Sequence, residues 1–119
     1  MLVTDDALLG GRDVVDVARR AVAGGVTSVQ LRLKQAAPRE LVRLARLLRG
    51  ALAVPVLVND RPDVAVAAGA GVHLGPDDLP VPLARSLLPP GTLIGTSVGT
   101  EAEVVRALAE EGADYWGIG

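Results

Sequence analysis

The sequence predicts an α/β protein in which strands of a parallel sheet alternate with helices. Short aliphatic segments rich in Val, Leu and Ile alternate with longer amphipathic segments along the whole chain. Successive strands lie about 20 residues apart, which is close to the repeat of a (β/α)8 TIM barrel and tighter than most doubly wound folds. We therefore expect an α/β fold of the TIM barrel type, with only about six βα units in residues 1–119.

The first half of the chain is expected to contain two strands and two helices. A short strand at 2–4 leads through a Gly-Gly loop to a helix that ends at a second Gly-Gly pair, residues 24–25. The apolar positions of this helix recur at helical spacing: Val14, Val17, Ala18, Ala21 and Val22. A second strand is expected at 28–34, and Pro38 fits the first turn of the next helix. The arginines of that helix fall away from its apolar stripe, so we expect them to be solvated: Arg39, Arg43, Arg46 and Arg49.

The second half continues the same alternation. Further strands are expected at 54–59, 71–74, 93–96 and 114–118. Thr100 and Glu103 match the T-x-x-E capping box at the start of a helix. A barrel of this type needs eight strands to close, and an edge left open at the sixth strand would expose unpaired backbone groups. We therefore expect residues 1–119 to be one domain that corresponds to the N-terminal portion of a TIM barrel, without the last two βα units.

Composition narrows the classes of partner. The formal net charge of -2 provides no general basic field, and an aromatic content of 2% cannot supply stacking platforms, so we expect no nucleic-acid partner. No apolar run approaches the length of a membrane span, and the N-terminus turns acidic where a signal peptide would stay apolar. The chain has no Cys, which makes the reducing cytoplasm the expected compartment. Small-molecule substrates are the expected partners, and the oligomeric state stays open, a homo-oligomer included.

Polar residues alternate with aliphatic ones along the second strand. Gln30, Arg32 and Lys34 fall on one face of a strand, with Val29 and Leu31 on the other. A row of one amide and two cations is a candidate anion site. A merely solvated face is the alternative, but a parallel sheet covered by helices leaves few strand side chains facing water.

Other polar residues follow the expected carboxyl ends of the strands, where ligands gather in such folds. They are Asn59 and Asp60 after the third strand, His73 in the fourth with Asp77 and Asp78 after it, and Ser97 and Thr100 after the fifth. This combination of cations, an amide and two carboxylates suits the binding of pyrophosphate. The basic side chains would hold the pyrophosphate, and Mg2+, which prefers oxygen ligands, would bridge it to the carboxylates.

Each of these residues also has a structural interpretation. Asp60 can cap the helix that follows it, and Asp77 or Asp78 can fix the turn after Gly75. His73 is either a neutral, hydrogen-bonded histidine lining the sheet or a proton shuttle. The glycine-rich loop around Ser97 offers backbone N–H groups to phosphate but lacks the P-loop pattern.

Taken together and in order, these segments resemble the thiamine phosphate synthase family, and the resemblance runs essentially end to end. The matching motifs are Leu2-Val3-Thr4-Asp5, Val29-Gln30-Leu31-Arg32-Leu33-Lys34, Val58-Asn59-Asp60-Arg61-Pro62-Asp63, Gly71-Val72-His73-Leu74-Gly75-Pro76-Asp77-Asp78-Leu79-Pro80, Ile94-Gly95-Thr96-Ser97 and Gly112-Ala113-Asp114-Tyr115-Trp116-Gly117-Ile118-Gly119. The resemblance implies a TIM barrel enzyme that joins hydroxymethylpyrimidine diphosphate to thiazole phosphate, with Mg2+ as cofactor, and releases pyrophosphate and thiamine phosphate.

The resemblance also implies roles for individual residues. Asp60 and Asp78 would hold Mg2+, and Ser97 would contact the pyrophosphate. The pyrimidine diphosphate would be bound by Gln30, Arg32, Lys34 and Asn59, and we add His73 as a candidate substrate-binding residue. No residue is assigned as a proton-transferring catalyst.

The chain departs from the family pattern in two ways. Leu33 stands where the family usually has Glu, and because Leu33 should point away from the site we expect altered packing more than altered catalysis. The family's lysine-bearing loop after strand six and its phosphate sites after strands seven and eight lie beyond Gly119.

Two alternatives stay open. One is the related thiazole tautomerase, which typically lacks the carboxylate loop that Asp78 represents and carries a His where this chain has Gly99. The other is a non-catalytic, truncated barrel.

Overall fold

The computed structural model describes residues 1–119 and contains one sheet of six strands, in which every neighbouring pair is parallel. The strands are Leu2–Val3 (β1), Val29–Leu31 (β2), Val56–Asn59 (β3), Gly71–Leu74 (β4), Ile94–Val98 (β5) and Tyr115–Ile118 (β6). They follow one another across the sheet in chain order. This order differs from that of doubly wound sheets, in which the strand order reverses at a switch point.

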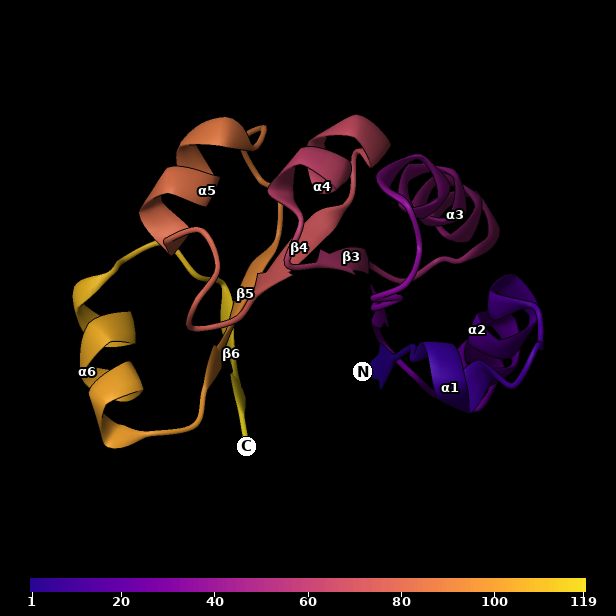
Figure 1. The fold of residues 1–119 in the computed structure, drawn as a ribbon, viewed down its shortest axis with the longest axis horizontal. Helices are drawn as coiled ribbons and strands as arrows, with labels where there is room; N and C mark the ends of the chain where they lie inside the picture. The colour runs from indigo at the N-terminus through magenta and orange to yellow at the C-terminus, as the bar shows by residue number, and fades with distance from the viewer.

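The helices lie in an arc outside the curled sheet, and the opposite face of the sheet carries no helix (Figure 1). Their bounds are Asp6–Leu9 (α1), Val14–Ala23 (α2), Pro38–Ala51 (α3), Pro62–Ala68 (α4), Val81–Leu87 (α5) and Glu101–Ala109 (α6). The result is a curled half-barrel of βα units, which confirms the predicted α/β class and parallel sheet. None of the helices combines the length and the apolar character needed to cross a membrane.

The core lies between the sheet and this arc of helices. Alternate strand residues contribute to it, among them Val29 and Leu31 of β2 and Val72 and Leu74 of β4, all at most 1% exposed. Because successive strand side chains point to opposite faces, the residues between them face the side without helices. Gln30 and His73 occupy such positions and are still only 4% and 8% exposed.

Three predicted boundaries differ from the structure. A loop was expected after the first strand, but Asp5 caps the short helix α1 there. The second strand was expected to reach residue 34, but β2 ends at Leu31, and the Arg32 N–H donates to the Thr4 hydroxyl. The fifth strand runs on to Val98, so Ser97 lies in β5 and not in the glycine-rich loop.

The four arginines of α3 are exposed, as predicted, and three of them also make contacts within the protein. Arg43 pairs with Glu40 of its own helix, at 2.6 Å. Arg46 and Arg49 instead donate to main-chain carbonyls at the C-terminal end of α4. Those carbonyls have no partner within α4, so the two arginines stabilise the contact between the helices.

Candidate functional site at the carboxyl ends of the strands

A pocket of about 520 Å³ opens where the helix-free face of the sheet meets the carboxyl ends of the strands. Five of the six predicted substrate-binding side chains line it: Gln30, Arg32, Asn59, His73 and Ser97. They come from or follow four neighbouring strands, β2 to β5. The structure therefore brings together residues that are up to 67 positions apart in sequence, from Gln30 to Ser97.

His73 is hydrogen-bonded through both ring nitrogens. Nδ1 lies 2.9 Å from the Tyr115 hydroxyl, and Nε2 lies 2.8 Å from Ser97 Oγ. Burial lowers the pKa of His73, and the negative charge of Asp78 opposes this only in part, so the imidazole is neutral at pH 7. This agrees with the first interpretation of His73, a neutral histidine lining the sheet.

Tyr115 completes this chain of polar contacts. Burial raises the pKa of its phenol, against a hydrogen bond with Gln30, so the hydroxyl keeps its proton at neutral pH. If Tyr115 donates to Nδ1 of His73, then Nε2–H donates to Ser97 Oγ and the Ser97 proton is free to point into the pocket. A Cβ atom at Gly95 would lie 2.1 Å from the Tyr115 ring, so only glycine at this position leaves room for it.

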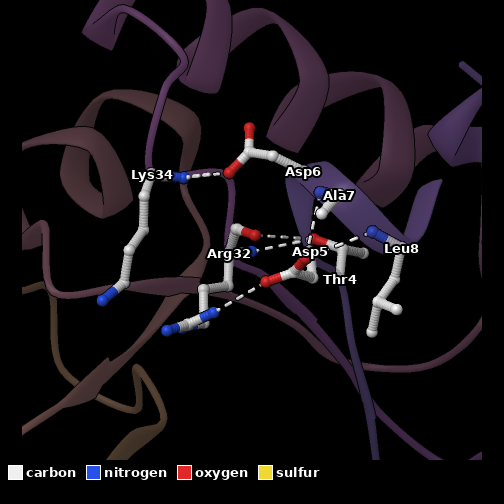
Figure 2. A network of polar contacts seen from close by, with 7 residues as sticks. All are labelled: Thr4, Asp5, Asp6, Ala7, Leu8, Arg32 and Lys34. Atoms are coloured by element: carbon white, nitrogen blue, oxygen red, sulfur yellow. Dashed lines mark hydrogen bonds and ion pairs between the residues drawn. The ribbon is translucent and has the colours of Figure 1, made fainter. Parts of the chain in front are cut away.

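Arg32 and Lys34 do not share one pocket. Arg32 faces the large pocket and forms an ion pair with Asp5, at 3.2 Å between Nη1 and Oδ2 (Figure 2). Lys34 lines a neighbouring hollow of about 310 Å³ together with Asn59 and Asp60. β2 ends at Leu31, so strand alternation alone does not place Lys34, but the Arg32 and Lys34 side chains extend next to each other in Figure 2 and the polar row stays a prediction. Asn59 lines both hollows and connects them.

Leu33 lies between the two cations and packs against the hydrophobic core, partly buried. Its side chain is absent from the large pocket but lines the neighbouring hollow with Lys34 and Asp60, so the expectation that it points away from the site holds for the large pocket alone.

Asp60 and Asp78 lie side by side although 18 residues separate them in sequence. Burial raises the pKa of Asp60, and both a hydrogen bond with Asp78 and its negative charge raise it further, while Lys34 and Asn59 act in the opposite direction. Asp60 has a left-handed φ of 62°, which is uncommon for a residue other than glycine. The capping interpretation of Asp60 was wrong, because Arg61 holds the N-cap position of α4 without a side-chain cap.

Asp78 has both a structural and a possible ligand role. Its Oδ2 accepts a hydrogen bond from the Gly75 N–H at 2.6 Å and so fixes the turn after β4, as the structural interpretation predicted. Asp77 is exposed and lines neither of the two hollows.

The adjacent carboxylates of Asp60 and Asp78 fit a hard divalent cation. Two like charges held together repel each other, and a cation between them would relieve this repulsion. No group of three His, Cys, Asp or Glu side chains is placed to enclose a metal ion. Mg2+ does not require one, because it commonly keeps water and substrate phosphate oxygens among its ligands.

Sequence reasoning missed Asp5 and Tyr115 as members of this site. Asp5 precedes a short helix that the periodicity did not predict, so its link to Arg32 carried no local signal. The sequence held one indication of Tyr115, namely Gly95 in the neighbouring strand. A glycine inside a strand often marks the close approach of another group.

Fold and site together define a class: a curled parallel βα sheet with a pocket at the carboxyl ends of its strands, lined in part by polar side chains. Within this class the chain belongs to the thiamine monophosphate synthase family, whose sequence profile matches residues 1–119.

Named relatives agree with this membership. The thiamine-phosphate synthase of Syntrophomonas wolfei is 50% identical over 98% of this chain and 57% of its own length. The enzyme of that name from Methanoculleus marisnigri is 53% identical over 96% of this chain and 56% of its own length. The solved structure of the thiamine phosphate pyrophosphorylase from Pyrococcus furiosus is 38% identical, with a TM-score of 0.85 over 99% of this chain and 58% of that one. The chain thus spans somewhat more than half of the length of these relatives.

Proposed function

We propose that the protein acts as a thiamine phosphate synthase, which joins hydroxymethylpyrimidine diphosphate to thiazole phosphate and releases pyrophosphate. The observation that carries this proposal is the pocket where Gln30, Arg32, His73 and Ser97 converge beside the Asp60/Asp78 pair. Family membership over residues 1–119 supports the same reaction. We also propose that the curled sheet belongs to a (β/α)8 TIM barrel, because its strand order and one-sided helices are those of that fold.

In the proposed reaction the C–O bond between the pyrimidine methylene and the diphosphate breaks, and the ring amine stabilises the resulting cation. The thiazole nitrogen then donates its electron pair to this carbon and forms the C–N bond. Most of the barrier comes from the charge that develops on the leaving diphosphate. The residues of this site would therefore act by electrostatic stabilisation more than by proton transfer.

Each side chain has a part in this scheme. Arg32 and the Ser97 hydroxyl would donate to diphosphate oxygens from inside the large pocket, and Lys34 would add positive charge from the neighbouring hollow. Gln30 and Asn59 offer amides to the pyrimidine ring. A neutral His73 would hold Ser97 in place without transferring a proton.

Mg2+ is the proposed cofactor, with Asp60 and Asp78 as its protein ligands. When bound there, it would neutralise part of the diphosphate charge as a Lewis acid. Substrates this strongly charged cross membranes poorly, so we propose the cytoplasm as the compartment of the reaction.

The test is to incubate the protein with both substrates and Mg2+ and to follow thiamine phosphate by chromatography and pyrophosphate by a coupled assay. We expect the two products in equal amounts, and none without Mg2+. Isomerisation of the thiazole phosphate alone would favour the tautomerase alternative. Binding of pyrophosphate without turnover would favour a non-catalytic barrel.

A further inference from the structure

The Asp5 carboxylate makes different contacts with its two oxygens (Figure 2). Oδ1 accepts hydrogen bonds from the N–H groups of Ala7 at 3.0 Å and Leu8 at 3.2 Å, which is the N-cap arrangement of α1. Oδ2 lies 3.2 Å from Arg32 Nη1. One side chain therefore connects the first turn of a helix to a cation that lines the pocket.

The residues on either side of Asp5 fix the same segment by its backbone. Thr4 Oγ1 accepts from the Arg32 N–H at 2.9 Å, and Asp6 Oδ2 accepts from the Lys34 N–H at 2.7 Å. These bonds hold residues 32–34 where the strand ladder has already ended. Of these three residues, only Asp5 forms a hydrogen bond with the side chain of a pocket residue.

The Arg32 side chain keeps most of its hydrogen-bonding capacity. A guanidinium carries five N–H donors, and the single side-chain bond of Arg32 uses Nη1. The Arg32 and Asp5 side chains are 32% and 35% exposed, so water reaches both. An arginine this exposed would sample many rotamers without a partner, and ordering it for a ligand would cost entropy.

We propose that Asp5 is a positioning residue for the diphosphate site: it holds the Arg32 guanidinium toward the pocket and leaves the remaining donors free for phosphate oxygens. This inference rests on the proposed function, in which Arg32 receives the diphosphate. The inference predicts the direction in which a change at Asp5 alters anion binding. Loss of Asp5 weakens anion binding, although it removes a negative charge close to the site.

The test compares Asp5→Asn with Asp13→Asn, using calorimetry with inorganic pyrophosphate and Mg2+. Both aspartates are N-caps, and Asp13 accepts from the Asp16 N–H at 2.9 Å in the first turn of α2. In both variants the asparagine oxygen can still cap the helix and one negative charge is lost, but only Asp5→Asn removes an acceptor from Arg32. We expect about three- to fivefold weaker binding for D5N, the upper range for a partly exposed ion pair, and unchanged binding for D13N.

A double-mutant cycle separates positioning from a structural role. In an Arg32→Leu background, D5N should cause no further loss, because its partner is already gone. Asp5→Ser is a second variant that keeps a good cap without reaching Arg32, and it should behave like D5N.

Unchanged or tighter pyrophosphate binding by D5N and D5S would overturn the inference, and so would an equal loss in the Arg32→Leu background. A wild-type protein that binds no pyrophosphate would instead refute the proposed diphosphate site itself, and this result is readily distinguished from the others.

Discussion

Two arginine–aspartate pairs join neighbouring βα units of this protein, and they differ in the donors that each leaves free. Arg32 pairs with Asp5 at 3.2 Å, and Arg85 pairs with Asp114 at 2.8 Å. Their arginine side chains are similarly exposed, 32% and 30%. By distance and exposure alone, the two pairs would be assigned the same role.

The remaining contacts separate them. Arg85 also donates to the Thr92 carbonyl at 2.5 Å and, through Nε and Nη2, to the Gly112 carbonyl. Asp114 accepts a further bond from the Ile94 N–H at 2.7 Å. All three guanidinium nitrogens of Arg85 are therefore engaged within the protein. In Arg32 the side chain makes one such bond and points into a pocket.

The two pairs lie at opposite ends of the strands, one at the amino ends and the other at the carboxyl ends. Arg85 of α5 binds Thr92 and Asp114, which precede β5 and β6, whereas Asp5 and Arg32 follow β1 and β2. In parallel βα folds the carboxyl ends of the strands carry ligand sites and the amino ends carry stability. The number of free donors on each arginine agrees with this division.

The largest effect that this division predicts is at Asp78. Asp78→Ala should abolish Mg2+-dependent pyrophosphate release, by at least about 100-fold, while the protein stays folded, because one of the two proposed metal ligands is lost. Asp78→Asn should lose activity similarly although it keeps an oxygen acceptor for the Gly75 N–H, which separates the ligand role from the turn. Turnover and circular dichroism are measured on both. Undiminished turnover in Asp78→Asn would end the metal assignment.

At the amino ends, Arg85→Met should lower the free energy of unfolding by about 2 kcal/mol, because it removes several charge-assisted hydrogen bonds to carbonyls and to Asp114. The methionine keeps the aliphatic part of the side chain. Urea denaturation measures the stability, and calorimetry should give wild-type affinity for pyrophosphate. Weaker pyrophosphate binding with unchanged stability would contradict the division between the two ends.

Arg32→Leu is the complementary change at the carboxyl ends. It should weaken diphosphate binding about tenfold, because one charge-assisted contact to phosphate is lost, and leave the urea midpoint nearly unchanged. Calorimetry with pyrophosphate and Mg2+ measures the affinity. Equal affinities of Arg32→Leu and wild type would refute the anion site.

Much of the architecture could be predicted from the sequence because each element carries its own local signal. Aliphatic runs indicate the strands, glycine pairs indicate helix ends, and the rule that ligands gather at strand ends correctly groups Asn59 with His73. The closed barrel and the roles of the site residues stay predictions.

What the sequence could not provide are contacts between side chains and the backbone of another element. Arg46 is exposed as expected, but its hydrogen bond to a carbonyl of α4, 21 residues away, was not predicted. The segment after β2 is held by Thr4, which follows β1, and by Asp6 of α1, which accept from the N–H groups of Arg32 and Lys34. Such bonds depend on distances between elements that periodicity does not encode.

The smallest effect expected is the pH dependence of stability at Asp114. Burial alone would raise the pKa of Asp114, but hydrogen bonds from the Ile94 N–H and Arg85, with the positive charge of Arg85, lower it below its usual value. The group therefore stabilises the fold above its unfolded pKa of about 3.9, and this stabilisation is lost as the pH falls through the lower folded value.

In Asp114→Asn this contribution is absent, although an amide oxygen in the place of Oδ2 can still accept from both Arg85 and the Ile94 N–H. We expect the variant to be less stable than wild type at pH 7 by a modest amount, and the difference to shrink as the pH falls below about 4. Urea denaturation of both proteins from pH 7 to pH 3 measures this difference. A difference that stays constant with pH would mean that the Asp114 charge does not stabilise the fold, and that the link between β5 and β6 depends on neutral hydrogen bonds alone.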